Sequence, residues 1–394
     1  MAALQEAARD PGRVVRGPVL WLLLQTAVGI VVGVSLVDVV IGKLDQGTDL
    51  RGEAKLLQDD YLSWRNRPGY WDETTTISSL GLRSPEIPAD ASPTEVRILG
   101  VGPSTTFGAG PGHPSMSEVW APFLEQRLEA DGDADWRVLN GGVNGYSTIQ
   151  ACRRGMELIP EVEPDLLLIF IDPSGVSLLD NTAARHARLW HGRAVPPDIV
   201  DTWPELLLPV VLAVHERLLE WSNLYVRTRM KANVIPRPVT ADHYIHAGQD
   251  AGPWAADAYA ETLAELVLLR DTCAKAGIEL RVVLSLDGVQ YSEAWWERYL
   301  LANQQRGAPA LGTDREEPQR ALARDLSARG IASWSLYDLQ SGFGDDKKWI
   351  LSDRSHWSRE GHLAVARVLY EDMRDEELPP ILVRRRAANP RGRD

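Results

Sequence analysis

Five short apolar segments that alternate with helix-like segments constrain the fold of this chain more than any other feature. They are too short for helices and end near glycine or polar residues, so they predict buried strands. The predicted strands are 96–101, 136–139, 165–171, 279–286 and 331–337, and helices are predicted at 118–128, 255–276 and 358–372. Because strands that alternate with helices form a parallel sheet covered on both faces, we expect a three-layer α/β/α fold with five parallel strands.

A long interval between the third strand and the next helix interrupts this alternation. It covers about 175–254, and its segment 206–231 is helix-like and rich in leucine and valine. An interval of this length is more often a lid or a docking surface than a structureless loop. Its apolar part can rest on a membrane or pack on the domain, and we expect packing.

The segment 18–37 carries no charged residue and is long enough to cross a membrane as a helix. The central region of a signal peptide is usually shorter, about 7–15 residues. Arginines are in excess before the segment, which favours a cytoplasmic N-terminus. We therefore expect a cytoplasmic tail (1–17), a retained transmembrane anchor (18–42) and an exported remainder. A cleaved signal peptide is the alternative.

The net charge of −13 argues against a nucleic-acid-binding protein, because phosphate recognition needs a broad cationic surface. Positive charge gathers instead at 384–386 and near the C-terminus, where we expect a solvated basic tail (376–394). Contact of this tail with anionic lipid is the alternative.

Two cysteines, Cys152 and Cys273, exclude a disulfide-rich scaffold and a four-cysteine zinc site. Both lie in helix-like segments, so we expect buried free thiols. A single bridge between them stays open if the domain lies in an oxidising compartment.

Reactive side chains follow the first and the last predicted strand. Open parallel sheets place their sites at the carboxyl ends of the strands. Ser104 comes just after the first strand, and a serine at this place is more often only a helix cap. Asp353 lies three residues before His356 beyond the fifth strand, so its carboxylate can orient the imidazole. Their joint occurrence at one edge predicts a Ser104–His356–Asp353 catalytic triad.

These residues resemble the sequence blocks of the SGNH (GDSL-type) hydrolase family. The first block is Gly102-Pro103-Ser104, the second matches 140–147, and the last is Asp353 with His356. The preceding polar arm (43–94), expected to pack on the main domain, resembles that of bacterial envelope members. The resemblance implies a flavodoxin-like SGNH domain at 95–375 with the insertion at 175–254. It also implies that the amides of Ser104 and Gly142 bind the oxyanion.

The sequence departs from the family at two places. Pro103 replaces the aspartate of the first block, which alters the turn and leaves the nucleophile. The asparagine of the third block is missing, and only Ser174 could substitute for it. Since losing one oxyanion donor lowers rates by about 10²–10³-fold, a slow enzyme is expected.

The resemblance implies a serine-dependent ester hydrolase or O-acyltransferase that acts on a cell-envelope carbohydrate or lipid ester. Water as the acceptor makes it an esterase. A sugar hydroxyl makes it a transferase, for which a membrane acyl-donor protein would be the partner. The expected place is the bacterial inner membrane, with the catalytic domain in the periplasm or outside the cell. No cofactor or metal is expected. A non-catalytic SGNH-like domain that binds a glycan or a membrane partner is the alternative.

Overall fold

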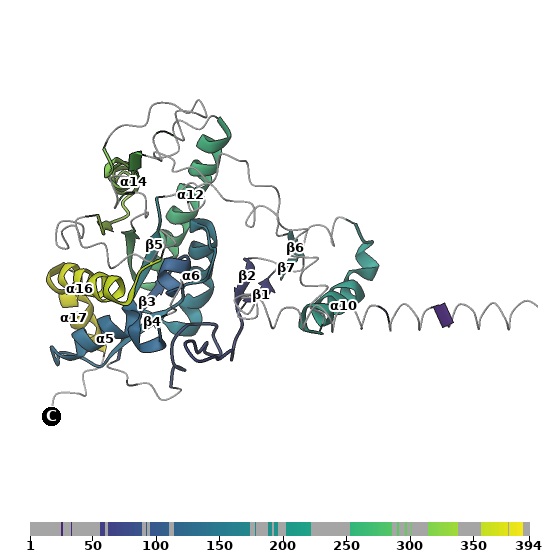
Figure 1. Ribbon diagram of the computed structural model, residues 1–394, viewed down its shortest axis with the longest axis horizontal. Helices are drawn as coiled ribbons and strands as arrows, with labels where there is room; N and C mark the ends of the chain where they lie inside the picture. The colour runs from purple at the N-terminus through teal and green to yellow at the C-terminus, as the bar shows by residue number, and fades with distance from the viewer. Residues whose placement is uncertain are drawn as a thin grey trace, which may run out of the picture. The chain divides into compact units, whose positions relative to one another are not determined.

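The computed structural model describes residues 56–88, 95–173, 188–190, 193–195, 202–221, 253–285, 314–337 and 356–388 with short gaps, and a few isolated residues besides (Figure 1). The chain divides into two units, 1–58 with 202–233 and 59–201 with 234–394. The smaller unit contains η2 (Glu205–Leu207) and α10 (Leu208–Trp221), and β1 (Leu56–Asp59) lies across the boundary. The larger unit contains β2 (Ser63–Asn66), a β-hairpin of β6 (Arg188–Trp190) and β7 (Arg193–Val195), and the main sheet.

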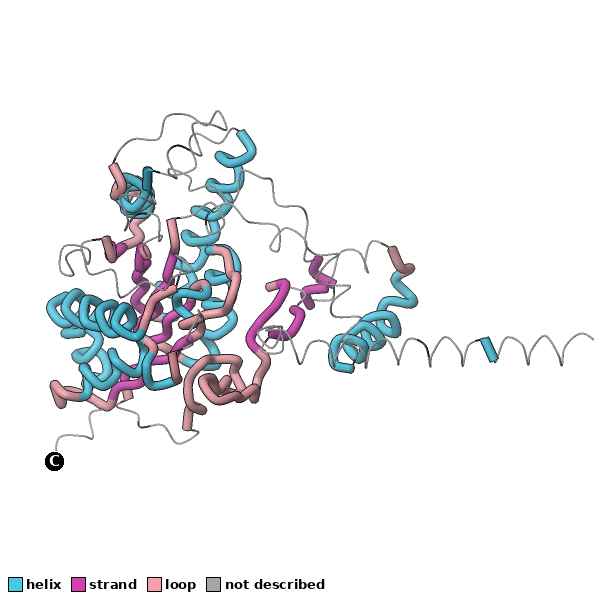
Figure 2. The backbone as a smooth tube through the Cα atoms, viewed as in Figure 1, coloured by secondary structure: helices cyan, strands magenta, loops and turns pink. Residues whose placement is uncertain are grey.

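The main sheet has five strands, all parallel, in the order β4-β3-β5-β8-β9. Figure 2 shows its strands in magenta, with helices beside them in cyan. The strands are β3 (Val96–Val101), β4 (Trp136–Asn140), β5 (Leu166–Ile171), β8 (Glu279–Leu284) and β9 (Ser333–Ser335). This arrangement confirms the predicted five-stranded parallel α/β fold and has the flavodoxin-like strand order. Of the strands of the main sheet, β3 comes first along the chain and lies inside the sheet, between β4 on one side and β5 on the other.

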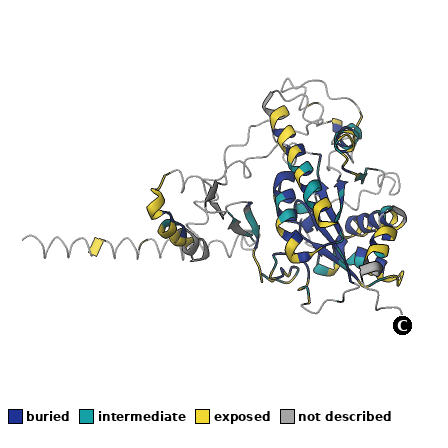
Figure 3. Cartoon of the chain, turned by 180° about the vertical axis from the view of Figure 1, so that it is seen from behind, coloured by how far each residue is buried: buried dark blue, intermediate teal, exposed yellow. Residues whose placement is uncertain are grey.

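Helices cover both faces of the sheet (Figure 1). The helices of the larger unit are α4 (Ser104–Phe107), η1 (Met116–Glu118), α5 (Trp120–Glu129), α6 (Thr148–Val162), α12 (Pro253–Ala276), α14 (Glu317–Ser327), α16 (Arg359–Glu376) and α17 (Leu378–Ala388). Leu168 and Phe170 of β5 belong to one core cluster with residues of α5, α16 and α17. Leu167 and Ile169 lie beside Gly155 of α6 and Leu269 of α12, on the opposite face. The central strand is therefore buried on both sides (Figure 3).

The C-terminal region differs from the predicted basic tail (376–394). Its residues 378–388 form helix α17, and Leu378 and Ile381 of this helix are buried in the core. Arg384 pairs with Glu279 at the start of β8, with 2.7 Å between Nη1 and Oε1. Residues 378–388 are therefore a helix packed on the core, because two apolar residues three positions apart share one helix face, while Arg384 of the basic run stays exposed.

The predicted anchor and most of the insertion lie outside the described residues. Of the anchor (18–42), the structure describes Gln25, Thr26 and Gly33. None of the helices that it describes combines the length and the apolar character needed to cross a membrane. Within the insertion, α10 covers part of the predicted helix 206–231 and buries Leu208 and Leu212.

Both cysteines are free and buried, as expected from their helical segments. Cys152 lies on α6 and Cys273 on α12, two helices on the same face of the sheet. Burial raises the pKa of the Cys152 thiol and raises that of Cys273 to about 12. Both thiols are therefore uncharged at neutral pH and pack as small apolar groups.

Candidate active site

Ser104 lies on the first turn after β3, at the carboxyl edge of the sheet. Pro103 is the N-cap of α4, with φ −77°, which is the value that its ring imposes. The four-residue helix α4 closes with hydrogen bonds from the Phe107 amide to the Pro103 carbonyl (3.0 Å) and from the Gly108 amide to the Ser104 carbonyl (2.9 Å). Gly108 is left-handed, with φ 88°. Ser104 is half-buried, whereas the three residues after it are buried.

The loop after β4 is bonded to α4 through the buried side chain of Asn140. Its amide nitrogen donates to the carbonyls of Thr106 (2.9 Å) and Phe107 (3.3 Å). Its oxygen accepts the amide hydrogen of Gly142 at 3.0 Å. Asn140 lies in the sequence block quoted for the family resemblance, but no role was predicted for it.

Gly142 packs against the backbone of α4. A Cβ atom at this position would lie 2.3 Å from the Phe107 nitrogen, so only glycine fits. The carbonyl of Gly142 accepts a hydrogen bond from Asn66 at 2.9 Å. Because the amide of Gly142 already donates to Asn140, it can bind an oxyanion only if that bond breaks. In this structure Gly142 therefore serves the packing of the site.

His356 lies three residues before the start of α16. The ring of its neighbour Trp357 contacts Phe170 of β5 edge-on, with centroids 6.3 Å apart. Phe170 in turn packs against Trp120, whose indole nitrogen donates to the carbonyl of Thr106 in α4. The two sequence segments that supply the predicted nucleophile and base thus share one aromatic cluster. Asp353 and Ser174 lie outside the described residues.

His362, on the first turns of α16, is a buried group at this place that the sequence interpretation missed. It is fully buried, with its ring edge-on to Trp357 at 5.3 Å, and neither ring nitrogen has a hydrogen-bond partner among the described residues. Burial, together with the nearby Arg83 and His356 side chains, lowers its pKa to about 3. His362 is therefore neutral at physiological pH.

The depressed pKa of His362 predicts a pH-dependent stability. The unfolded chain binds a proton at this side chain below its ordinary pKa of 6.5, whereas the folded chain does so only near pH 3. Stability should therefore fall as the pH drops from 6.5 towards 3, by about 1.4 kcal/mol per pH unit for one proton. In thermal melts across this range, His362→Phe should show a flatter dependence than the wild type. Parallel curves for the two proteins would contradict the prediction.

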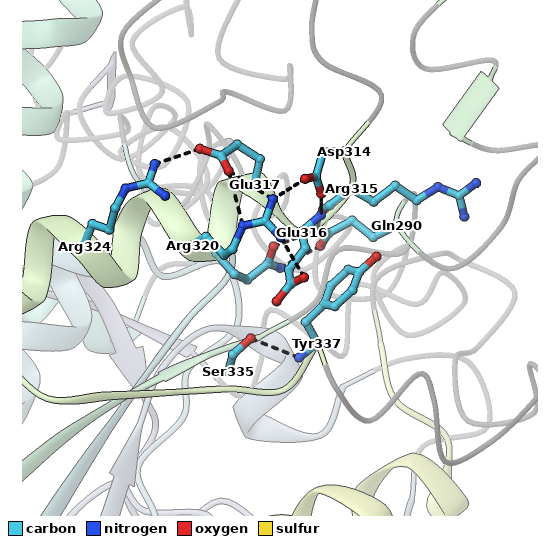
Figure 4. A network of polar contacts seen from close by, with 10 residues as sticks. Gln290, Asp314, Arg315, Glu316, Glu317, Arg320, Arg324, Ser335 and Tyr337 are labelled. Carbon is cyan, nitrogen blue, oxygen red and sulfur yellow. Dashed lines mark hydrogen bonds and ion pairs between the residues drawn. The ribbon is translucent and has the colours of Figure 1, made fainter.

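A second polar cluster surrounds the start of α14 (Figure 4). Arg320 forms ion pairs with Asp314, with Glu316 (2.9 Å) and with Glu317 (3.1 Å), and Arg324 pairs with Glu317 (2.7 Å). Surface ion pairs of this kind contribute little to stability. The cluster orders the beginning of α14. Within the part of the chain that the structure describes, no group of His, Cys, Asp or Glu side chains could hold a metal ion.

Comparison with known proteins finds similar structures but no similar sequences. No protein-family model matches the chain, and no curated protein does. The esterase EstA from Pseudoalteromonas sp. has 10% identity and a TM-score of 0.36, covering 71% of this chain and 96% of its own. The lipase/acylhydrolase from Enterococcus faecalis has 12% identity and a TM-score of 0.36, covering 71% and 95%. The acetyl xylan esterase AlAXEase has 12% identity and a TM-score of 0.38, covering 70% and 99%.

Proposed function

We propose that this chain is a serine-dependent acyl-ester hydrolase or O-acyltransferase of the SGNH type, with Ser104 as its nucleophile. The observation that carries the proposal is the position of Ser104. The chain runs from β3 outward to β4 and then back across β3 to β5, so the carboxyl end of β3 lies at the topological switch point of the sheet. Open α/β sheets bind their ligands at this point. Ser104 is the half-buried serine that follows β3 there.

The proposed reaction proceeds through an acyl-enzyme. His356 takes the proton of the Ser104 hydroxyl while the hydroxyl oxygen attacks the ester carbonyl, and Asp353 orients the imidazole. The tetrahedral intermediate collapses, and the leaving alcohol receives the proton from His356. Water or a sugar hydroxyl then attacks the acyl-enzyme, with His356 again as the base. Of the predicted oxyanion donors, the amide of Ser104 and the side chain of Ser174 remain in this proposal, since the amide of Gly142 is engaged.

The substrate class follows from the sequence. The uncharged segment 18–37 supports a membrane anchor and an exported catalytic domain, and hence an acylated carbohydrate or lipid ester of the cell envelope. A membrane acyl-donor protein would be the partner if the enzyme is a transferase.

A fluorophosphonate probe tests the enzyme and the anchor in one experiment. Membrane and soluble fractions of cells that produce the full chain are treated with the probe, for wild type and Ser104→Ala. We expect a labelled band in the membrane fraction of the wild type alone, because only an activated serine reacts with the probe.

The outcome also decides between the two candidate functions. Absence of labelling in both proteins would favour the non-catalytic binding domain. Two observations support that alternative: Pro103 replaces the aspartate of the first block, and the amide of Gly142 already donates to Asn140. Labelled wild-type protein in the soluble fraction would contradict the membrane anchor but would still support the serine-dependent activity.

A further inference from the structure

The polar arm before the main domain contributes a buried arginine to the neighbourhood of Ser104. Arg83 is 2% exposed. Its Nη1 donates to the carbonyls of Phe107 (2.7 Å) and Gly108 (3.0 Å) at the end of α4. Its Nη2 donates to the carbonyls of Thr74 (3.2 Å) and Pro114 (2.6 Å), and the guanidinium lies 4.9 Å from the centre of the Phe107 ring. The side chain of Arg83 thus joins the arm to both ends of the segment 108–114, which follows α4.

Helix α4 depends on such contacts from outside. A helix of four residues is not stable alone, because nucleation costs more than its few hydrogen bonds return. The carbonyls at its C-terminal end lack partners within the helix, and a cation is favourable there. The backbone amide of Arg83 also donates to the Asn140 carbonyl at 2.8 Å. Arg83 therefore holds α4 and the end of β4 in one relative position.

The burial of Arg83 is unfavourable in itself. Among the described residues, the four hydrogen bonds that its side chain donates all go to backbone carbonyls, and its Nε is buried without a hydrogen-bond partner. Burial lowers its pKa to about 10, so it stays charged at neutral pH. An apolar side chain at this place would leave the buried carbonyls of Phe107 and Gly108 without this donor, which is unfavourable. The charged fork therefore ties the end of α4 to the arm in one geometry.

We infer that Arg83 is a positioning residue that fixes Ser104 for attack by holding the C-terminal carbonyls of α4. The effect on the reactivity of Ser104 rests on the proposed function. The effect of Arg83 on the position of α4 does not, and it can be measured without any reaction.

The test compares Arg83→Met and Arg83→Lys with Arg154→Met in the full chain. Arg154 is a matched control, since it is 4% exposed and its side chain donates to the carbonyl of Leu80 in the arm and to Glu157, and not to the carbonyls of α4 that Arg83 binds. We expect Arg83→Met to slow fluorophosphonate labelling by roughly 10–100-fold, the effect of a small misplacement of the nucleophile. Arg83→Lys should be intermediate, since an ammonium cannot reproduce the planar fork. KM for a small acetyl ester should stay within about twofold, because binding of the substrate is not the step affected.

Hydrogen exchange of the peptide that covers 104–109 is the second readout. It should be faster in both Arg83 variants than in Arg154→Met, with thermal melts showing that each protein is folded. If Arg83→Met does not fold, Arg83→Lys carries both comparisons. Exchange and labelling equal to those of Arg154→Met would overturn the inference. Faster exchange in the Arg83 variants with an unlabelled wild type would support the hold on α4 and refute the proposed function.

Discussion

Replacing Ser104 or His356 with alanine is expected to lower the rate of acetyl-ester hydrolysis by at least about 10³-fold, and replacing both is expected to lower it little further. The reason is that a serine hydroxyl is a poor nucleophile without a base, and the base has no role without the nucleophile. The measurement is the turnover of a small acetyl ester by the two single variants and the double variant.

Ser327→Ala serves as the control for these variants. Ser327 is exposed at the end of α14, and its replacement should leave the rate unchanged. Losses that multiply in the double variant would show that Ser104 and His356 act independently, and the triad would then be refuted. A residual rate in Ser104→Ala close to that of the wild type would place the nucleophile elsewhere.

Gly142→Ala is expected to destabilise the larger unit by about 1–3 kcal/mol or more. The new Cβ would lie 2.3 Å from the nitrogen and 2.8 Å from the Cα of Phe107, and 2.7 Å from the carbonyl carbon of Thr106. These are backbone atoms, so the strain cannot be relieved by a rotamer change. Urea denaturation of the two proteins gives the difference in the free energy of unfolding.

Gly155→Ala is the matched comparison for that experiment. Gly155 is also buried, but its nearest neighbour would be 3.4 Å from the new Cβ, which is an ordinary contact. It lies inside α6, where alanine is favoured over glycine by up to about 1 kcal/mol. We expect Gly155→Ala to be neutral or stabilising. Equal destabilisation by both substitutions would mean that close packing on α4 is not what requires glycine at 142.

The sheet, and the edge of it at which a site can form, were predictable from the sequence. Buried parallel strands are continuous apolar runs, so their pattern is local and can be read without contacts: the segment 96–101 coincides with β3, and 165–171 and β5 differ by one residue. The position of Ser104 after β3 followed directly. The last strand was less well predicted, since 331–337 shortens to β9, where the burial of the strand is only partial.

The polar groups that serve the site could not be predicted from the sequence, because their partners are distant along the chain. Arg83 stands in a turn-rich arm and looks like a surface residue, yet its carbonyl partners at Phe107, Gly108 and Pro114 lie 24 to 31 residues further on. Helix α17 was not predicted for the same reason. Its basic residues suggest a solvated tail, whereas the burial of Ile381 depends on contacts with core residues that are distant in the sequence. Gly142 shows the limit most directly. The family resemblance of its sequence block implies that its amide binds the oxyanion, whereas in the described structure this buried amide donates to the Asn140 side chain, since a buried amide needs a hydrogen-bond partner.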